Sequence, residues 1–411
     1  MLPALPHGES GTRLQEKRLR ITLVYDLMHP FTIGGAERRF YEIGRRLARR
    51  HDVHFVSLKH WSGDATIRTP EGYTLHGVPN FPAAQYGQDG RRNPLQPLWF
   101  GAMLLCSPRL FRADIIDCSS FPFFSMFSSR AHASLAGIPL IGTWHEFWGD
   151  YWSSYAGRLG LVGRSIERLA VRSPSRIVSV SELTRRGIEG AGLGPGRITV
   201  VPNGVDSSEL ESRVDPNPAP DLVFVGRLIE EKGAHILIEA MTREPLGRLM
   251  AGCVIVGQGP EEGRLRAMAS RLGLTERVRF ISRLEQAELN GLMASARVLV
   301  LPSSREGFGM VVIEAMALGT PVVVTTSPQS AAPDLVSHGT DGLVAERTPE
   351  AVARAVETIL TSPALRARMG EAARKKAALY DWNAITDRME GVYVEAIRTH
   401  GRPRRSRREA D

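Results

Sequence analysis

The feature that most constrains the fold is a strand–helix–strand unit in the last third of the chain. Residues 298–302 form the apolar run VLVLP, which is typical of a buried parallel strand. We expect a helix from about Gly309 to Leu318, because Gly319 suits a helix end and Pro321 prevents continuation. Residues 322–325 then return as a second strand. This pattern predicts an α/β protein with a ligand site beyond the strand ends.

Two carboxylates flank the ligand edge of this unit. Glu306 lies in the loop before the predicted helix, and Glu314 lies inside the helix. Between them, Gly307 and Gly309 would let backbone N–H groups approach an anion beside the positive helix end. A sugar joined through a diphosphate to a ribose would fit such a site.

The whole phrase, EGFGMVVIEAMALGTPVVV, resembles the paired-glutamate signature of retaining family-four glycosyltransferases of the GT-B fold. The resemblance covers roughly residues 20–400 and implies two Rossmann-like domains facing a central cleft. It implies that Glu314 holds ribose hydroxyls and that Glu306 orients the transferred sugar. The implied donor-binding residues of this phrase are Glu306, Gly307, Phe308, Gly309, Met310 and Glu314. The alternative is an ordinary Rossmann unit with a solvated Glu306 and a buried, ion-paired Glu314.

Three shorter phrases extend the predicted donor site. In GRLIEEKG, Arg227 and Lys232 flank a strand-to-helix turn and could clamp a diphosphate. They match the phosphate-binding Arg and Lys of the family. The phrase GGAER resembles the family's glycine loop, so Gly34 and Gly35 are donor-site candidates, with a plain tight turn as the alternative. Gly257, in GQGP, is a weaker candidate at a further turn.

His145 is the candidate active-site residue of the first half. It follows a predicted strand, residues 138–143, and matches a family histidine in the active cleft. Aromatic and acidic residues surround it in WHEFWGDYW, and they suit the C–H faces and hydroxyls of sugars. We therefore predict an acceptor side made by Trp144, Glu146 and Asp150. A purely structural histidine is the alternative.

The length of 411 residues suffices for two α/β domains. A polar, proline-rich run at residues 207–220 is the best boundary. From residue 61 to 97 we expect a long irregular segment. The predicted organisation is a disordered basic arm (1–17), an acceptor domain (18–206), a linker (207–220), a donor domain (221–380), a helix crossing back to the first domain (381–400) and a disordered Arg-rich tail (401–411).

The positive charge is concentrated in the first half, which holds 25 Lys and Arg against 16 Asp and Glu. Without a nucleic-acid-binding module, this asymmetry favours contact with an anionic membrane, and a merely basic surface is the alternative. Arg91 and Arg92 precede an apolar stretch that is either an interfacial patch or a core helix. Three scattered cysteines and no evident leader or membrane span predict a cytoplasmic protein, peripheral at the inner face of the membrane.

The resemblance implies a retaining, metal-independent hexosyltransferase. It would move a sugar such as mannose or glucose from a nucleotide diphosphate sugar to a glycan, lipid or small-molecule acceptor. His145, Glu306, Arg227 and Lys232 are the predicted catalytic residues. No DxD motif is present, so we expect no metal and no cofactor. The alternatives are a sugar-nucleotide 2-epimerase of the same fold and a non-catalytic sugar-nucleotide-binding protein.

Overall fold

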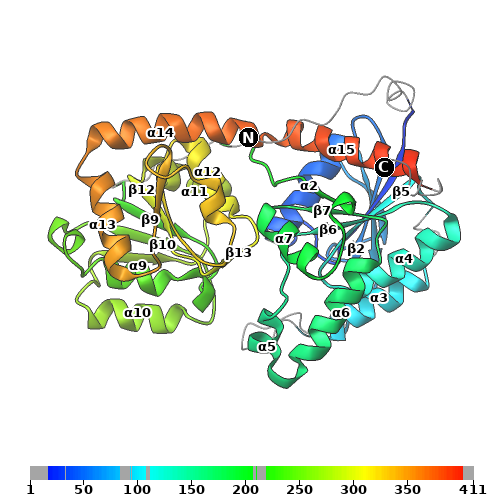
Figure 1. Ribbon diagram of the computed structural model, residues 1–411, viewed down its shortest axis with the longest axis horizontal. Helices are drawn as coiled ribbons and strands as arrows, with labels where there is room; N and C mark the ends of the chain where they lie inside the picture. The colour runs from blue at the N-terminus through cyan, green and yellow to red at the C-terminus, as the bar shows by residue number, and fades with distance from the viewer. Residues whose placement is uncertain are drawn as a thin grey trace, which may run out of the picture.

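The computed structural model describes residues 17–32, 34–83, 93, 95–107, 112–206, 210 and 219–400. It shows two α/β domains side by side, and the last helix lies on the first domain (Figure 1). Within these residues, no helix combines the length and the apolar character needed to cross a membrane.

The first domain is built on an eight-stranded sheet in the order β3-β4-β2-β1-β5-β6-β7-β8, parallel except for the edge strand β3. Its strands are β1 (Arg20–Val24), β2 (Asp52–Leu58), β3 (Thr66–Arg68), β4 (Thr74–Val78), β5 (Ile115–Ser119), β6 (Leu140–Trp144), β7 (Arg176–Ser179) and β8 (Ile198–Val200). Its helices are α2 (Gly35–Leu47), α3 (Leu95–Leu105), α4 (Phe124–Ala136), α5 (Tyr151–Ala156), η2 (Gly157–Leu159), α6 (Gly160–Arg172), α7 (Glu182–Gly190) and η3 (Pro195–Arg197).

Two apolar cores cover the two faces of this sheet. Successive strand residues alternate between them: Leu23 packs in the core with α2, and Val24 packs in the core with α3, α4 and α6. Parallel sheets covered on both faces need such continuous apolar strands. The predicted irregular segment 61–97 is partly wrong, because β3 and β4 extend the sheet there. Short strands rich in polar residues carry little periodic signal.

The second domain has a six-stranded parallel sheet in the order β11-β10-β9-β12-β14-β16 and a short pair, β13-β15. Its strands are β9 (Leu222–Val225), β10 (Cys253–Val256), β11 (Val278–Ile281), β12 (Val298–Leu301), β13 (Arg305–Glu306), β14 (Val322–Thr325), β15 (Gln329–Ser330) and β16 (Gly342–Ala345). Its helices are η4 (Glu230–Lys232), α9 (Ala234–Ala240), η5 (Leu246–Leu249), α10 (Glu262–Arg271), α11 (Gln286–Ser295), α12 (Met310–Leu318), η6 (Ala332–Leu335), α13 (Pro349–Leu360), α14 (Pro363–Ala377) and η7 (Ala378–Tyr380).

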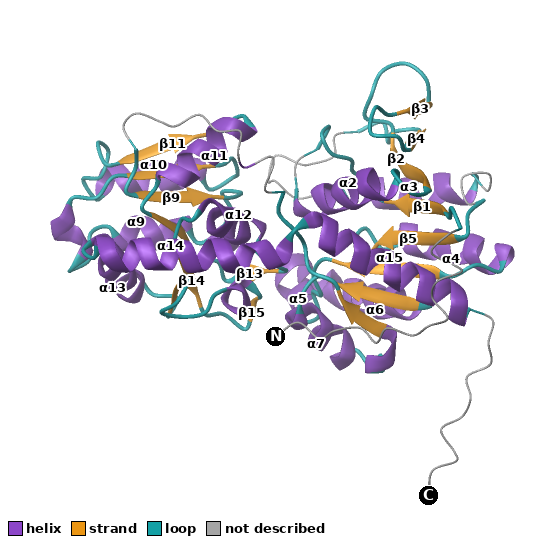
Figure 2. Cartoon of the chain, turned by 90° about the horizontal axis from the view of Figure 1, so that it is seen from above, coloured by secondary structure: helices purple, strands orange, loops and turns teal. Residues whose placement is uncertain are grey.

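The last helix, α15 (Trp382–Thr399), packs against α2 of the first domain (Figure 2). Trp382 and Tyr393 are fully buried in the core beneath α2. The Tyr393 hydroxyl donates to Asp117 on β5, which also accepts a bond of 2.7 Å from Thr143. Burial of these side chains fixes α15 to the first domain.

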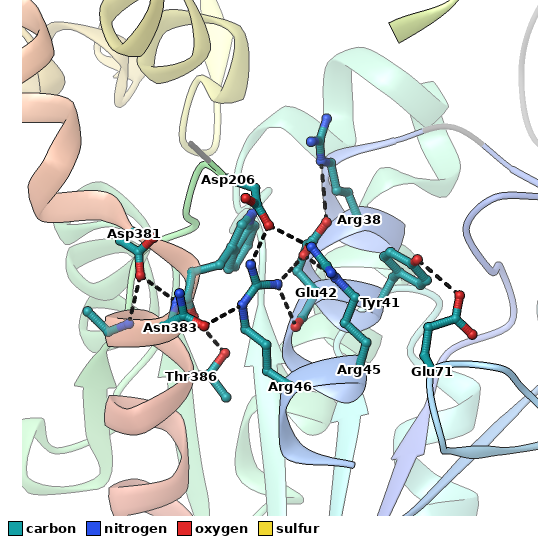
Figure 3. A network of polar contacts seen from close by, with 12 residues as sticks. Arg38, Tyr41, Glu42, Arg45, Arg46, Glu71, Asp206, Asp381, Asn383 and Thr386 are labelled. Carbon is teal, nitrogen blue, oxygen red and sulfur yellow. Dashed lines mark hydrogen bonds and ion pairs between the residues drawn. The ribbon is translucent and has the colours of Figure 1, made fainter. Parts of the chain in front are cut away.

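One polar network ties both chain crossings to α2 (Figure 3). Asp206, where the first crossing begins, accepts from Arg45 at 2.6 Å and from Arg46. Arg46 also donates to Asn383 in the first turn of α15, at 3.1 Å. The crossings themselves meet in a parallel bridge between Val205 and Asp381. We call the place where the two crossings meet, at Val205 and Asp381, the hinge. Breaking these ion pairs would leave buried charges unpaired, which costs free energy, so the contacts hold the hinge against α2.

Candidate active site

The second domain places its charged candidates at one point of its sheet. The strands that follow β9 in the chain are added first on one side of it, as β10 and β11, and then on the other side, from β12 onward. Ligands of open α/β sheets bind outside such a switch point, which here lies between β9 and β12. Arg227 follows β9 directly and is exposed, and Lys232 ends the short helix η4. Glu306 follows β12 in the short strand β13.

Lys232 and Glu306 contact each other directly. The Lys232 ammonium donates to Glu306 Oε1, and both side chains are mostly buried. The Ser303 hydroxyl donates to the same oxygen at 3.3 Å. The turn between Lys232 and α9 is tight, because Gly233 has φ +74° and a Cβ there would lie 2.2 Å from the Pro302 carbonyl oxygen. These contacts bring together two predicted residues that lie far apart in the sequence.

The start of α12 has the conformation that its glycines permit. Gly309 precedes the helix with φ +105°, a region that side-chain-bearing residues rarely adopt. Phe308 packs in the core and is only 6% exposed, so only its backbone is available to a nucleotide-sugar donor. Met310 is half-buried and lies against Gly35 of the first domain. The start of α12 therefore lies against the start of α2 in the first domain.

Glu314 pairs with the first domain. Arg38, on α2, donates to its Oε1 at 3.3 Å. Arg38 belongs to the GGAER phrase, but the sequence does not reveal its partner 276 residues away. Through Arg38 at one end and the hinge network at the other, α2 connects the hinge to the donor side.

The glycines at 34 and 257 approach protein groups in the structure. At Gly34 a Cβ would lie 2.3 Å from Oε2 of Glu37, whose carboxylate folds back over the start of α2. Burial raises the pKa of Glu37, opposed by its own backbone N–H and by Arg227. At Gly257, with φ +151°, a Cβ would lie 1.9 Å from the Gly226 carbonyl oxygen. The close packing against Gly226 thus explains why position 257 is a glycine. A phosphate at Gly34 would have to displace the Glu37 carboxylate.

His145 faces the second domain directly after β6. Its carbonyl oxygen approaches Gly307 so closely that a Cβ on Gly307 would lie 2.0 Å away. The imidazole packs beside Tyr25 and Phe40, with ring centroids 6.4 and 5.9 Å away. Its Nε2 atom is buried and has no hydrogen-bond partner among the described residues. Burial, with a smaller effect of Arg39, lowers the pKa of His145 to about 3, so the ring is neutral at physiological pH.

The three residues predicted for the acceptor side lie in three different environments. The prediction for Trp144 is wrong, because its side chain is fully buried in the core with α3, α4 and α6. Asp150 is exposed and pairs with Arg164 at 2.7 Å, so it lies at the surface. Glu146 instead contacts the second domain, where it accepts from Arg305. Burial raises the pKa of Glu146, and Arg305 opposes this effect.

Arg305 is a site residue that the sequence analysis missed. Its side chain is 8% exposed, and its guanidinium carbon lies 3.5 Å from the ring centroid of Tyr151 and 4.6 Å from that of Trp148. Tyr151 also donates to Glu231 of the second domain. We name these contacts, of Arg305 with Glu146, Trp148 and Tyr151 and of Tyr151 with Glu231, the interdomain clasp. Trp148 and Tyr151, which follow β6 in the first domain, therefore contact the second domain at Arg305, the residue before Glu306.

A buried carboxylate on α6 accepts hydrogen bonds from the loop that follows β6. Glu167 on α6 is fully buried and accepts from the backbone N–H groups of Trp148 and Gly149, both at 2.8 Å, and from the Trp152 indole at 3.1 Å. Its spacing from the loop gives no sequence signal. Among the described residues, no cluster of three His, Cys, Asp or Glu side chains is placed to bind a metal ion. The metal-independent chemistry stays a prediction.

Comparison with known proteins agrees with this arrangement. A model described as Glycosyltransferase Family 4 matches residues 33–209, and one described as Glycosyl transferases group 1 matches residues 208–376. A glycogen synthase of Mycobacterium tuberculosis (strain ATCC 25618 / H37Rv) is 29% identical over 407 residues, covering 94% of this chain and 97% of its own. D-inositol 3-phosphate glycosyltransferase 2 of Catenulispora acidiphila is 35% identical over 226 residues, or 50% and 52% of the two chains.

Solved structures share the fold. Sucrose-phosphate synthase of Thermosynechococcus elongatus superposes with a TM-score of 0.77 at 20% identity, over 93% of this chain and 100% of its own. HepE of Anabaena, in complex with UDP and glucose, gives 0.71 at 22% identity, over 91% and 99%. The predicted GT-B fold of two Rossmann-like domains is therefore confirmed.

Proposed function

Because the chain belongs to the glycosyl transferases of group 1, we propose that it moves a hexosyl unit from a nucleotide diphosphate sugar to a glycan or lipid acceptor. We propose retention at the anomeric carbon and no metal cofactor. The observation that carries the proposal is the direct pairing of Lys232 with Glu306 at the β9/β12 switch point, with Gly307 against His145. A cation for phosphate and a carboxylate for sugar hydroxyls are thereby adjacent.

The charges of the second domain suit the leaving diphosphate. Arg227 and Lys232 would bind its oxygens, and the start of α12 adds the positive end of a nine-residue helix. Preorganised groups of this kind stabilise charge that develops in the transition state. Lys232 would then exchange its contact with Glu306 for the phosphate, which frees Glu306 to orient the sugar. Glu314 would hold the ribose hydroxyls.

His145 suits a positioning hydrogen bond better than proton removal from the acceptor. With its low pKa it is neutral and can donate or accept one bond. Retention places the acceptor on the face of the leaving group, where a phosphate oxygen can take the acceptor proton. His145 would contact a hydroxyl of the transferred sugar or its phosphate. The relative HepE, whose structure contains UDP and glucose, supports a donor of this class.

The proposal includes a peripheral contact with an anionic membrane, which the positive charge of the first half of the chain supports. A lipid or lipid-linked acceptor would be presented at such a surface.

Calorimetry with UDP, GDP and ADP tests the donor site. One of them should bind, and at 100 times its dissociation constant it should stabilise the fold by about 2.7 kcal/mol. The matching nucleotide sugars are then incubated with and without acceptor. Transfer to an acceptor supports the proposal. Conversion of the nucleotide sugar without acceptor identifies an isomerase instead, and binding without any turnover identifies a non-catalytic protein.

A further inference from the structure

We propose that the outer surface of the α3–α4–α6 layer, together with the α5–η2 turn, binds an anionic lipid bilayer. We call this surface the lower face, after its place in Figure 1. The inference rests on the membrane contact of the proposed function and assigns it to one surface. It replaces the patch around Arg91 and Arg92, which lie outside the described residues.

The lower face is one continuous helical layer. α3 packs against α4, and α4 packs against α6 and on β5 and β6. α2 and α15 cover the opposite side of the same sheet (Figures 1 and 2). The inner sides of α3, α4 and α6 contribute to the core on the sheet, and within the described parts of the chain no further layer of helices or strands covers their outer sides.

Exposed apolar side chains gather on this face. Thirteen large apolar side chains are exposed in the described parts of the chain, and eight of them belong to α3, α4, η2 and α6. Leu135 is 87% exposed, Leu159 70%, Leu161 68% and Leu169 60%. Single exposed apolar residues are ordinary, but a concentration on one layer marks an interaction surface.

The charge of the same helices has one sign. α3, α4, α5, η2 and α6 carry five arginines, Arg130, Arg158, Arg164, Arg168 and Arg172. Their single carboxylate is Glu167, which is fully buried beneath the aromatic loop. The exposed Asp150, just before α5, forms an ion pair of 2.7 Å with Arg164. Arg158 and Arg168 are exposed beside Leu159 and Leu169.

This combination favours a lipid surface over a soluble polyanion. Apolar side chains can enter the boundary of headgroups and acyl chains while neighbouring arginines contact anionic headgroups. A soluble polyanion would use the arginines but would not require exposed leucines. The lower face also contains α5, which continues the loop of the interdomain clasp, so a docked lipid acceptor would lie near the cleft.

The test measures binding of the full chain to vesicles of phosphatidylcholine with and without phosphatidylglycerol. The variant Arg158→Gln/Arg168→Gln should bind anionic vesicles roughly 30-fold more weakly, since each basic residue near the surface contributes about 1 kcal/mol. Leu161→Gln/Leu169→Gln should also weaken binding, at both low and moderate salt. The matched controls are Arg354→Gln/Arg368→Gln and Leu379→Gln, exposed in the second domain.

The outcomes separate the inference from the proposed function. Weaker vesicle binding by both lower-face variants, with controls like the wild type, supports the assignment. Wild-type binding that both variants retain overturns the lower face while leaving membrane contact intact, and no wild-type binding at low salt overturns both. Loss of binding in the arginine variant alone indicates a simple polyanion site and also overturns it. Nucleotide diphosphate affinity, measured on the same proteins, reports the donor site independently.

Discussion

The two domains contribute to the cleft in different ways. In the second domain, the charged candidates follow strands β9 and β12, which are neighbours in the sheet, so their proximity follows from strand order. In the first domain, the loop after β6 is held by groups from elsewhere: Glu167 supports it from α6, and Arg305 reaches it from the other domain. The charged groups of the proposed donor side are thus placed by the strand order of one sheet, and the loop after β6 is placed by contacts with α6 and with the other domain.

This difference has a consequence for the effects of mutations. Changes on the donor side should act mainly on nucleotide affinity, because the side chains that we propose to bind phosphate, Arg227 and Lys232, lie on one domain. Changes on the acceptor side should act on turnover, because they alter the placement of the first domain against Gly307. Measuring nucleotide affinity and turnover on the same variants shows whether the two sides of the cleft affect these two quantities separately.

The largest effect is expected for His145→Ala. Loss of one preorganised hydrogen-bonding group typically lowers turnover 10²- to 10³-fold. Nucleotide diphosphate affinity should stay within a factor of about two, because we propose that the second domain binds the nucleotide. Turnover, calorimetry and melting temperature are measured on the same preparation.

His132→Ala is the matched control for this variant. His132 is a buried histidine of the same domain, bonded to the Leu104 carbonyl at 3.0 Å and remote from the loop. It should lose stability while its folded fraction keeps turnover. If His145→Ala behaves like this control, His145 is a packing residue.

Lys232→Ala should mainly weaken binding. A hydrogen bond to a charged group contributes about 1.5–3 kcal/mol, so nucleotide diphosphate affinity should fall roughly 10- to 150-fold. The change also leaves Glu306 without its cation, which adds repulsion toward phosphate. Lys375→Ala, an exposed lysine paired with Glu371, should leave affinity unchanged. Unaltered calorimetric affinity in Lys232→Ala would remove Lys232 from the donor site.

The sequence predicted the elements better than the faces on which side chains lie. The strands expected at residues 138–143, 298–302 and 322–325 and the helices expected at 309–318 and 381–400 lie within two residues of the observed bounds, since apolar runs, glycines and prolines mark them. Trp144 shows the limit. It lies on the same face of β6 as Gly142, where a Cβ would be 2.8 Å from its ring. The alternation of strand residues from Gly142 to Trp144 could have indicated that the indole turns toward the core.

The ion-pair partners of Arg38 and Arg305 could not be predicted from the sequence, for a different reason. Arg38 and Arg305 stand beside residues that the motifs identify, yet each contacts a carboxylate on the other domain. Such pairs depend on how two domains meet, which no local pattern encodes. The fold and the proximity of Lys232 to Glu306 could thus be predicted, and the interdomain contacts could not.

Arg305→Lys tests whether the interdomain clasp positions the cleft. Lysine keeps the charge but cannot reproduce the planar contact with Tyr151 and Trp148. Loss of a desolvated cation–π contact costs about 1–2 kcal/mol, so turnover should fall roughly tenfold while nucleotide diphosphate affinity stays unchanged.

A double-mutant cycle with Glu146→Gln sharpens this test. If the two residues act as one contact, the combined loss of turnover should be smaller than the product of the single losses. A fall in melting temperature without any change in turnover would show that the clasp only stabilises the fold. Lys375→Ala again serves as the surface control.

The smallest effect concerns the pH dependence of stability. Burial lowers the pKa of His145 from 6.5 to about 3, so the unfolded chain binds a proton there that the folded chain does not. The stability that this group contributes is present above pH 6.5 and is lost as the pH falls toward 3. Between pH 7 and pH 5, urea unfolding should therefore show that the wild type loses about 1–2 kcal/mol more than His145→Gln. All other titrating groups, including the buried Asp117, whose pKa is raised to about 6, are common to both proteins and cancel in this difference. Equal losses in the two proteins would mean that the imidazole titrates normally and is open to water, which would contradict its place between Tyr25 and Phe40.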